Sequence, residues 1–305
     1  MARDVNLQTT LLALLLLAGL AADCAAGSLG QLREDVRTPA PAEEDPPPKK
    51  QEKAKEKQPA SSNNSSWWSS TDDCHTDDDS SIDITGTFAI VGVVATSPFW
   101  APIALCGDDP IIAGYFAPYP YEGTGGSMVF DRGTTGEIPP AGYVWAIKVR
   151  GEYGDDFDSL TRYSGHVLVE HSNRWGFDSE TNYWREATAG GGHDELWTGD
   201  ANLLFRFAQS ERAQFRAGLG ANWLSDNVGT ELGFNFTYSA DFYPAKPLVL
   251  SSELDAGWLG EAWLIHLRTT IGVQWRQVEV YTGYDYREIG STQLDGWISG
   301  VRVLF

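Results

Sequence analysis

One stretch near the C-terminus alternates strictly between two kinds of side chain. From Trp263 to Trp275 the odd positions are apolar or Thr, and the even positions are mostly polar or small. Successive strand residues point to opposite faces, so these thirteen residues predict one long β-strand with an apolar and a polar face. A soluble strand usually has about five or six residues. A strand tilted across a bilayer needs roughly 9 to 11, with aromatic residues at both interfaces. The length and the terminal Trp residues therefore favour a membrane strand.

The same alternation recurs in the C-terminal half of the chain. Eight further stretches show it: 143–153, 161–172, 196–209, 214–223, 231–242, 248–258, 278–288 and 294–305. Regularly spaced strands of this length, without intervening helical patterns, predict an all-β protein. We expect an antiparallel up-and-down transmembrane β-barrel of about ten strands, preceded by a disordered N-terminal segment.

The polar faces of these strands carry nearly balanced charges among many Gly residues. This composition suits a narrow lumen that is filled by paired side chains, with the apolar faces turned to lipid. The expected lumen charge network consists of Lys148, Arg150, Glu152, Glu170, Arg206, Arg216, Glu231, Asp241, Glu253, Asp255, His266, Arg268, Asp285 and Arg302. A soluble exported barrel that binds an apolar ligand would use the same alternation with the apolar face inward. That alternative stays open.

The last strand ends in a pattern with a known parallel. Trp297, Val301, Val303 and the terminal Phe305 lie on one face, which resembles the C-terminal strand of bacterial outer-membrane barrels. The stretches 205–211 and 215–220, with Pro118-Tyr-Pro-Tyr upstream, are similar to an uncharacterised family of barrel proteins. The resemblance implies an outer-membrane location, a lipid-bilayer partner and recognition of the C-terminal strand by barrel-assembly machinery. It implies no catalytic motif.

Parity places a tenth strand before residue 143. Bacterial barrels have even strand numbers and keep both termini on the periplasmic side. Residues 84–96 are rich in β-branched side chains and precede Ser97-Pro98, so we predict the first strand there, with a short buried helix as the alternative. The barrel then covers 81–305, with nine strands in 143–305, outer loops at 97–142 and 173–195, and a periplasmic turn at 154–160.

The same topology predicts an aromatic girdle and the position of two Cys residues. Trp145, Trp223, Trp258, Trp263 and Trp297 would lie towards the outer interface, and Trp275 and Phe305 towards the inner one. Cys74 and Cys106 would lie on opposite sides of the membrane and could not form a disulfide. The aromatic segment 97–142 would cover the outer mouth. We expect it to act there as a structural lid; the alternative is that, together with loop 173–195, it offers a surface for a partner.

The N-terminal part of the chain is typical of an export signal followed by a linker. Residues 1–26 contain an apolar Leu-rich run followed by small residues, as in a signal peptide; acylation of Cys24 is less favoured because Asp23 precedes it. Residues 27–80 are rich in Pro, Lys, Glu, Ser and Asp and predict a disordered linker. The acidic run at 72–79 lacks the Gly and terminal Glu of a calcium loop, so we expect no metal site.

Charge and motifs narrow the possible functions. A net charge of −20 argues against a nucleic-acid partner. His166, His193 and His266 each lie near a carboxylate, yet the chain has neither a Gly-x-Ser-x-Gly elbow nor a His-Glu-x-x-His motif. We expect no cofactor and no catalytic residues, and a structural or surface-interaction role, with a hydrolase at the barrel rim as the alternative.

Overall fold

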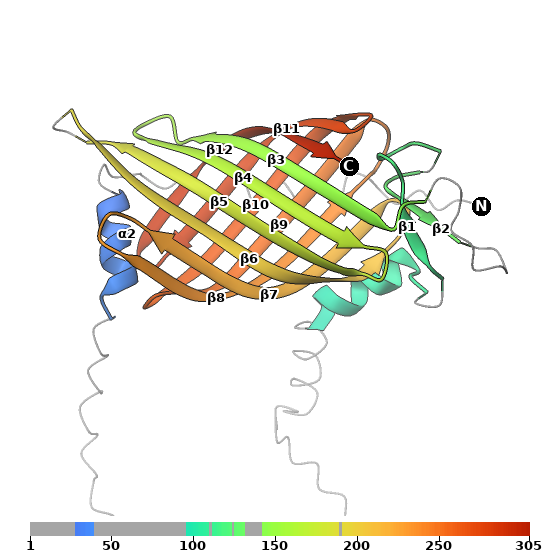
Figure 1. The fold of residues 1–305 in the computed structure, drawn as a ribbon, viewed down its shortest axis with the longest axis horizontal. Coiled ribbons are helices and arrows are strands. Elements are labelled where there is room, and N and C mark those ends of the chain that lie inside the picture. The colour runs from blue at the N-terminus through green and yellow to red at the C-terminus, as the bar shows by residue number, and fades with distance from the viewer. Residues whose placement is uncertain (1–27, 40–95, 110–111, 124, 132–141, 189–190) are drawn as a thin grey trace, which may run out of the picture. The chain divides into compact units, whose positions relative to one another are not determined.

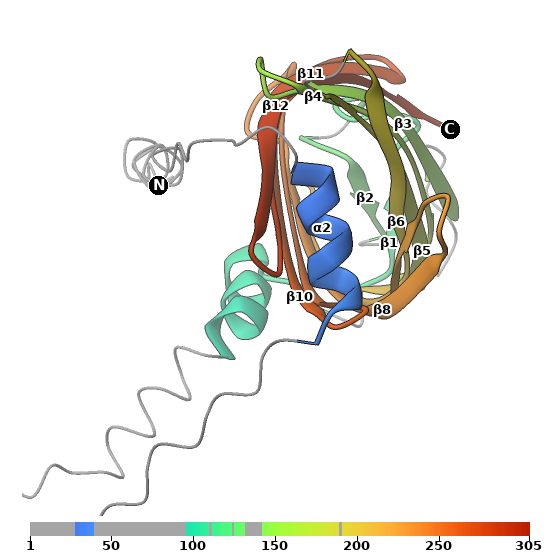
Figure 2. The same cartoon turned by 90° about the vertical axis from the view of Figure 1, so that its left-hand side faces the viewer.

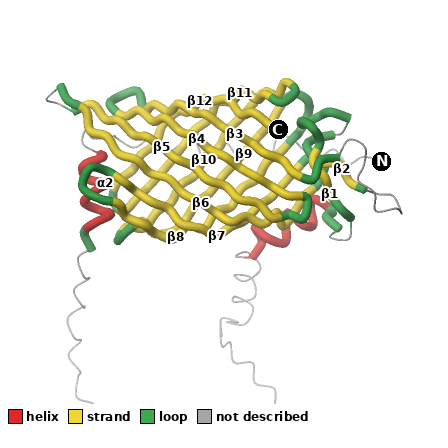
Figure 3. The backbone as a smooth tube through the Cα atoms, viewed as in Figure 1, coloured by secondary structure: helices red, strands yellow, loops and turns green. Residues whose placement is uncertain are grey.

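The wall of the molecule is a closed antiparallel barrel of ten strands. The computed structural model describes residues 28–39, 96–109, 112–123, 125–131, 142–188 and 191–305. Each strand pairs with its neighbour in the sequence, and β12 closes the barrel on β3 (Figure 1, Figure 3). The barrel strands are β3 (Trp145–Asp155), β4 (Leu160–His171), β5 (Trp175–Ala187), β6 (His193–Gln209), β7 (Ala213–Ser225), β8 (Thr230–Phe242), β9 (Leu248–Leu259), β10 (Ala262–Trp275), β11 (Val278–Ile289) and β12 (Thr292–Leu304).

The alternation of the sequence becomes an apolar exterior and a polar interior. Leu219 and Trp275, on the outer face, have 58% and 75% of their surface exposed. Arg206 and Arg216, on the inner face, have 0% and 2% exposed. Within the stretch 263–275, Ile271 is exposed while His266 and Arg268 are buried. The wall thus has the reverse of the polarity that a soluble barrel with an apolar core would show.

The total of ten strands is confirmed, but one strand lies elsewhere than expected. All ten lie within 145–304, so the expectation of nine strands from 143 is wrong. The additional strand is β5, which occupies most of the expected loop 173–195. The expected first strand at 84–96 lies outside the described residues except for Thr96, which begins a helical stretch over 96–106.

Because β5 is an additional strand, β3 and β4 run in the direction opposite to the expected one. The turn at 156–159 therefore lies at the same end as the turns at 188–192, 226–229, 260–261 and 290–291, not at the opposite one. Trp145 lies at the end that holds the C-terminus, where the Ile147 N–H donates to the Phe305 carbonyl at 3.1 Å. Its expected place beside Trp258 and Trp263 is therefore wrong.

Each end of the barrel is covered by a separate piece of chain. Helix α2 (Ser28–Arg37) lies inside the end formed by these five turns, which we name the α2 mouth (Figure 2). Because these residues are helical, their assignment to a disordered linker is wrong. None of the described helices is long and apolar enough to cross a membrane.

The other end, which we name the C-terminal mouth, carries residues 112–123 and 125–131. Strands β1 (Gly114–Phe116) and β2 (Met128–Phe130) pair here, and the Ser127 N–H donates to the Glu211 carbonyl at 2.9 Å. Phe116 and Met128 are buried. Of the aromatic segment 97–142, residues 112–123 and 125–131 cover a mouth, but at the end that holds Phe305 and not at the opposite one. They therefore form no common surface with the loop at 188–192. Phe99 instead packs on the wall against Phe207 and Tyr238.

Candidate functional site

Near the C-terminal mouth, two buried carboxylates in the interior each accept hydrogen bonds from several basic side chains. Glu170, on β4, accepts hydrogen bonds from Arg206 at 2.8 Å and from Arg216 at 2.8 and 2.9 Å. Asp241, on β8, accepts from Arg216 at 2.9 Å and from the Lys148 ammonium at 2.8 Å. All five side chains are buried, and charge-assisted bonds of this kind offset the cost of removing ions from water only when nearly every partner is satisfied.

The middle of the barrel repeats this arrangement on other strands. The Glu152 carboxylate accepts from Arg162, from Arg268 at 3.1 Å and from the Tyr281 hydroxyl at 2.9 Å. Glu180, on β5, accepts from Arg150. Several of these pairs join strands that are not neighbours in the wall, so their side chains cross the lumen and occupy the space that an open channel would need.

Neither ring nitrogen of His266 is available for proton transfer to a substrate. Nδ1 lies 2.7 Å from the Asp255 carboxylate and Nε2 lies 2.9 Å from the Asp285 carboxylate. The ring is buried and bridges β9 and β11. A general base needs one nitrogen in reach of the reacting group, so this geometry is that of a structural bridge.

The fourteen residues expected in the lumen divide into two groups. Twelve are buried in the interior, and Glu253 beside them is only slightly exposed. Glu231 instead lies at the α2 mouth, where it accepts from Arg37 of the helix at 3.3 Å. The expectation missed interior charges on β4 and β5, namely Arg162, Asp178 and Glu180. Two of these three stand in the strand that was expected to be a loop.

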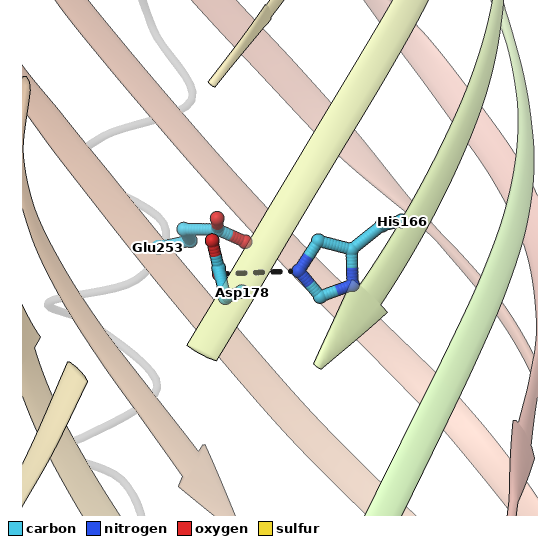
Figure 4. Close-up of side chains that lie close together, drawn as sticks. All are labelled: His166, Asp178 and Glu253. Atoms are coloured by element: carbon cyan, nitrogen blue, oxygen red, sulfur yellow. Dashed lines mark hydrogen bonds and ion pairs between the residues drawn. The ribbon is translucent and has the colours of Figure 1, made fainter. Parts of the chain in front are cut away.

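One group inside the barrel has residue types that bind metals. His166, Asp178 and Glu253 place one potential ligand atom each within 4.8 Å of one another (Figure 4). His166 Nε2 lies 3.2 Å from Asp178, whereas Glu253 accepts from Arg268 at 2.6 Å. The guanidinium group neutralises the Glu253 carboxylate, so the group is accounted for as part of the ion-pair network.

The α2 mouth combines apolar and charged contacts with the helix. Leu29, Leu32 and Val36 are at most 1% exposed and pack among apolar side chains that line this end of the barrel. Burying side chains of this size stabilises the docked helix by about 1.5–3 kcal/mol each relative to full exposure. These apolar lining residues are Leu160, Trp184, Leu196, Leu224, Leu259, Ala262, Leu264, Ile289 and Leu294.

The first turn of α2 is capped by the barrel. The Glu186 carboxylate accepts from the backbone N–H groups of Ser28 and Leu29 at 2.8 and 3.0 Å, and from the Ser28 hydroxyl at 2.9 Å. The first N–H groups of a helix lack partners within it, and a negative charge there also interacts favourably with the helix dipole. A residue of β5 thus performs the role that an N-cap side chain usually performs.

The last turns of α2 are held by carboxylates of the barrel rim. Arg33 donates to Asp194 at 2.7 Å and to Asp226 at 2.7 Å, and Arg37 donates to Asp226 at 2.8 Å. The Asp226 side chain is fully buried by these contacts. The hydrogen bond from Arg37 is the main reason that the pKa of Asp226 lies well below its ordinary value, with further lowering by the N–H groups of Gly229 and Val228.

Comparisons with known proteins add little to this geometry. No family model matches the chain, and no curated protein matches it. Among solved structures, CdiB from Acinetobacter baumannii aligns with a TM-score of 0.25 and 12% sequence identity, over 48% of this chain and 39% of that chain. The alignment therefore spans well under half of that protein.

Proposed function

We propose that the protein is an outer-membrane β-barrel with a structural or surface-interaction role and a lumen that does not conduct solutes. The main support is the polarity of the wall. A belt of exposed apolar side chains surrounds an interior of buried ion pairs, and an apolar surface of that extent is unfavourable in water. In a bilayer these apolar side chains contact lipid hydrocarbon instead of water, so the cost does not arise.

The aromatic side chains lie where the two interfaces of a bilayer would be, one on each side of that belt. Trp258 and Trp263 stack edge-to-face at 4.8 Å near the α2 mouth, and Trp275 and Phe305 are exposed near the C-terminal mouth. Aromatic rings of this kind prefer the boundary between headgroups and hydrocarbon. By the usual orientation of such barrels, the C-terminal mouth would face the periplasm and the α2 mouth the exterior.

The non-conducting lumen follows from the ion pairs that cross it. The cavities beside Trp184 and beside His266 each have a volume of about 20 Å³, which is room for roughly one water molecule. Solute passage would require breaking buried pairs such as Arg216 with Glu170. The protein therefore offers surfaces, at its two mouths, and not a pathway.

Two measurements test this function. Unboiled protein in detergent should migrate differently from boiled protein and should stay in the membrane fraction after a high-salt wash. Reconstituted into planar bilayers, it should give no stable openings of porin size. Extraction into buffer without detergent would refute the membrane assignment, and long-lived porin-like conductance would refute the closed lumen.

A further inference from the structure

The α2 mouth combines an apolar concavity with carboxylates on its rim, and sealing the barrel requires neither. Beneath the apolar lining, the guanidinium groups of Arg162 and Arg287 lie over the Trp184 ring, 5.3 and 5.6 Å from its centroid. Below them lie the pairs of Glu152 and Glu180. The lumen is thus closed without α2. The helix instead covers an apolar concavity that has carboxylates on its rim.

The rim carboxylates match the helix in position as well as in charge. Glu186 faces the helix N-terminus, while Asp194, Asp226 and Glu231 face the two Arg residues. Without a helix, this end would present the apolar lining residues and four acidic groups to water. Concave apolar surfaces with a few fixed polar groups are the usual form of a peptide-helix binding site.

The helix is connected to the rest of the chain like a tethered ligand. Between Arg37 and Phe99 lie the 61 residues from Thr38 to Pro98, and the contacts that fix α2 are non-covalent. Because the helix and its site belong to one polypeptide, their effective concentration is on the order of millimolar or below. A helix of similar affinity on another molecule could therefore compete with α2.

We propose that the α2 mouth is a docking site for a basic amphipathic helix of a partner protein, and that α2 is its intramolecular occupant. The recognition elements are taken from α2 itself. Apolar residues stand at the first, fourth and eighth positions from Leu29 to Val36, and Arg follows the second and third of them. The partner presents this pattern and an uncapped helix N-terminus to Glu186. The proposal concerns the barrel end itself and does not depend on the membrane assignment.

The test uses the full-length protein in detergent and a fluorescent synthetic peptide of residues 28–37. In the double variant Arg33→Glu/Arg37→Glu, repulsion from Asp194 and Asp226 should release the resident helix. The wild-type peptide should then bind this variant saturably, and should bind wild-type protein at least about tenfold more weakly because the site is occupied. A peptide carrying the same two Glu substitutions is the matched control and should not bind.

Release of the resident helix is measured independently with a thiol placed on its buried face. Val36 is 1% exposed and close to Cys in size, so Val36→Cys, with the native Cys residues replaced by Ser, reports undocking through its reaction with maleimide. The reaction should be faster when both Arg residues are also replaced by Glu. Millimolar wild-type peptide should accelerate it in the protein that retains both Arg residues, and this arm does not require the double variant to fold.

Two results would overturn the proposal. The first is an unchanged maleimide reaction at position 36 in both arms, which would mean that α2 is a fixed part of the barrel. The second is a released helix whose site takes up no peptide, which would mean that the concavity does not recognise a helix supplied by another molecule.

Discussion

The buried carboxylate of Glu170 offers the sharpest test of the interior. Replacing it with Gln keeps the volume but removes the charge that faces Arg206 and Arg216. Loss of one partner of a buried ion pair costs about 3–5 kcal/mol, because the remaining charge is left without compensation. Arg216 keeps Asp241 at 2.9 Å and Arg206 keeps Gln209 at 2.9 Å, so we expect the lower end of that range, about 3 kcal/mol.

The assay is urea unfolding in lipid vesicles, followed by Trp fluorescence, with heat-modifiable migration as a check that the barrel forms. The matched control is Glu195→Gln, because Glu195 is half exposed and its nitrogen-to-oxygen distance to Arg185 is 3.7 Å. An exposed pair of this kind contributes about 0–1 kcal/mol. If both substitutions cost the same small amount, the interior is not a dry ion-pair network.

Three further predictions concern the mouths and the wall. The pKa of Asp226 is lowered when α2 is docked. Its contribution to docking is therefore complete above the ordinary carboxyl pKa near 3.8 and is lost as the pH falls through the lowered pKa. The protease sensitivity of α2 should stay constant from about pH 7 to 5 and rise only in strong acid. Gly257→Ala should destabilise the barrel by about 1–3 kcal/mol, because its Cβ would lie 1.9 Å from the Phe234 carbonyl, whereas Gly165→Ala, with nothing within 4 Å, should be nearly neutral in the same urea assay. Phe116→Ala removes the ring that lies 4.6 Å from the Arg206 guanidinium and should loosen β1 and β2, seen as faster amide hydrogen exchange there and unchanged exchange in β9 and β10.

The sequence predicted the two faces of nine of the ten wall strands, because the alternation signal is local. Alternation along one strand reports the environment of both faces, so residues such as Ile271 and Arg268 could be assigned to opposite sides without knowing any pairing. The identity of each ion pair could not be predicted in the same way. Lys148 and Asp241 are 93 positions apart, and only the closure of the barrel brings them within 2.8 Å.

Strand β5 was missed because its two faces differ little in polarity. Ser179 and Thr181 stand on the outward face, while Trp184 stands on the inward one. Omitting one strand left the barrel end assigned to each later strand unchanged, and inverted the end assigned to the described segments before it. The error in the position of Trp145 and of the segment 97–142 has that single cause, which parity alone could not reveal because the total stayed even.

Helix α2 carried a signal that a search for strands overlooks. Leu29, Leu32 and Val36 have the spacing of a helical stripe, and Arg33 and Arg37 are four positions apart. The neighbouring Pro- and charge-rich sequence favoured a linker for the whole region. A helix of ten residues is marginal in isolation, so its formation depends on the barrel end that receives it.

The placement of α2 also bears on how the polypeptide is threaded. Arg37 lies at one mouth, and Phe99 packs against Phe207 and Tyr238 on the half of the wall nearer the other. The described residues before and after the range 40–95 therefore lie towards opposite mouths. In a membrane-embedded barrel Ser28 and Phe305 would therefore lie on opposite sides, and any account of assembly has to deliver the helix to its end before or while the wall closes.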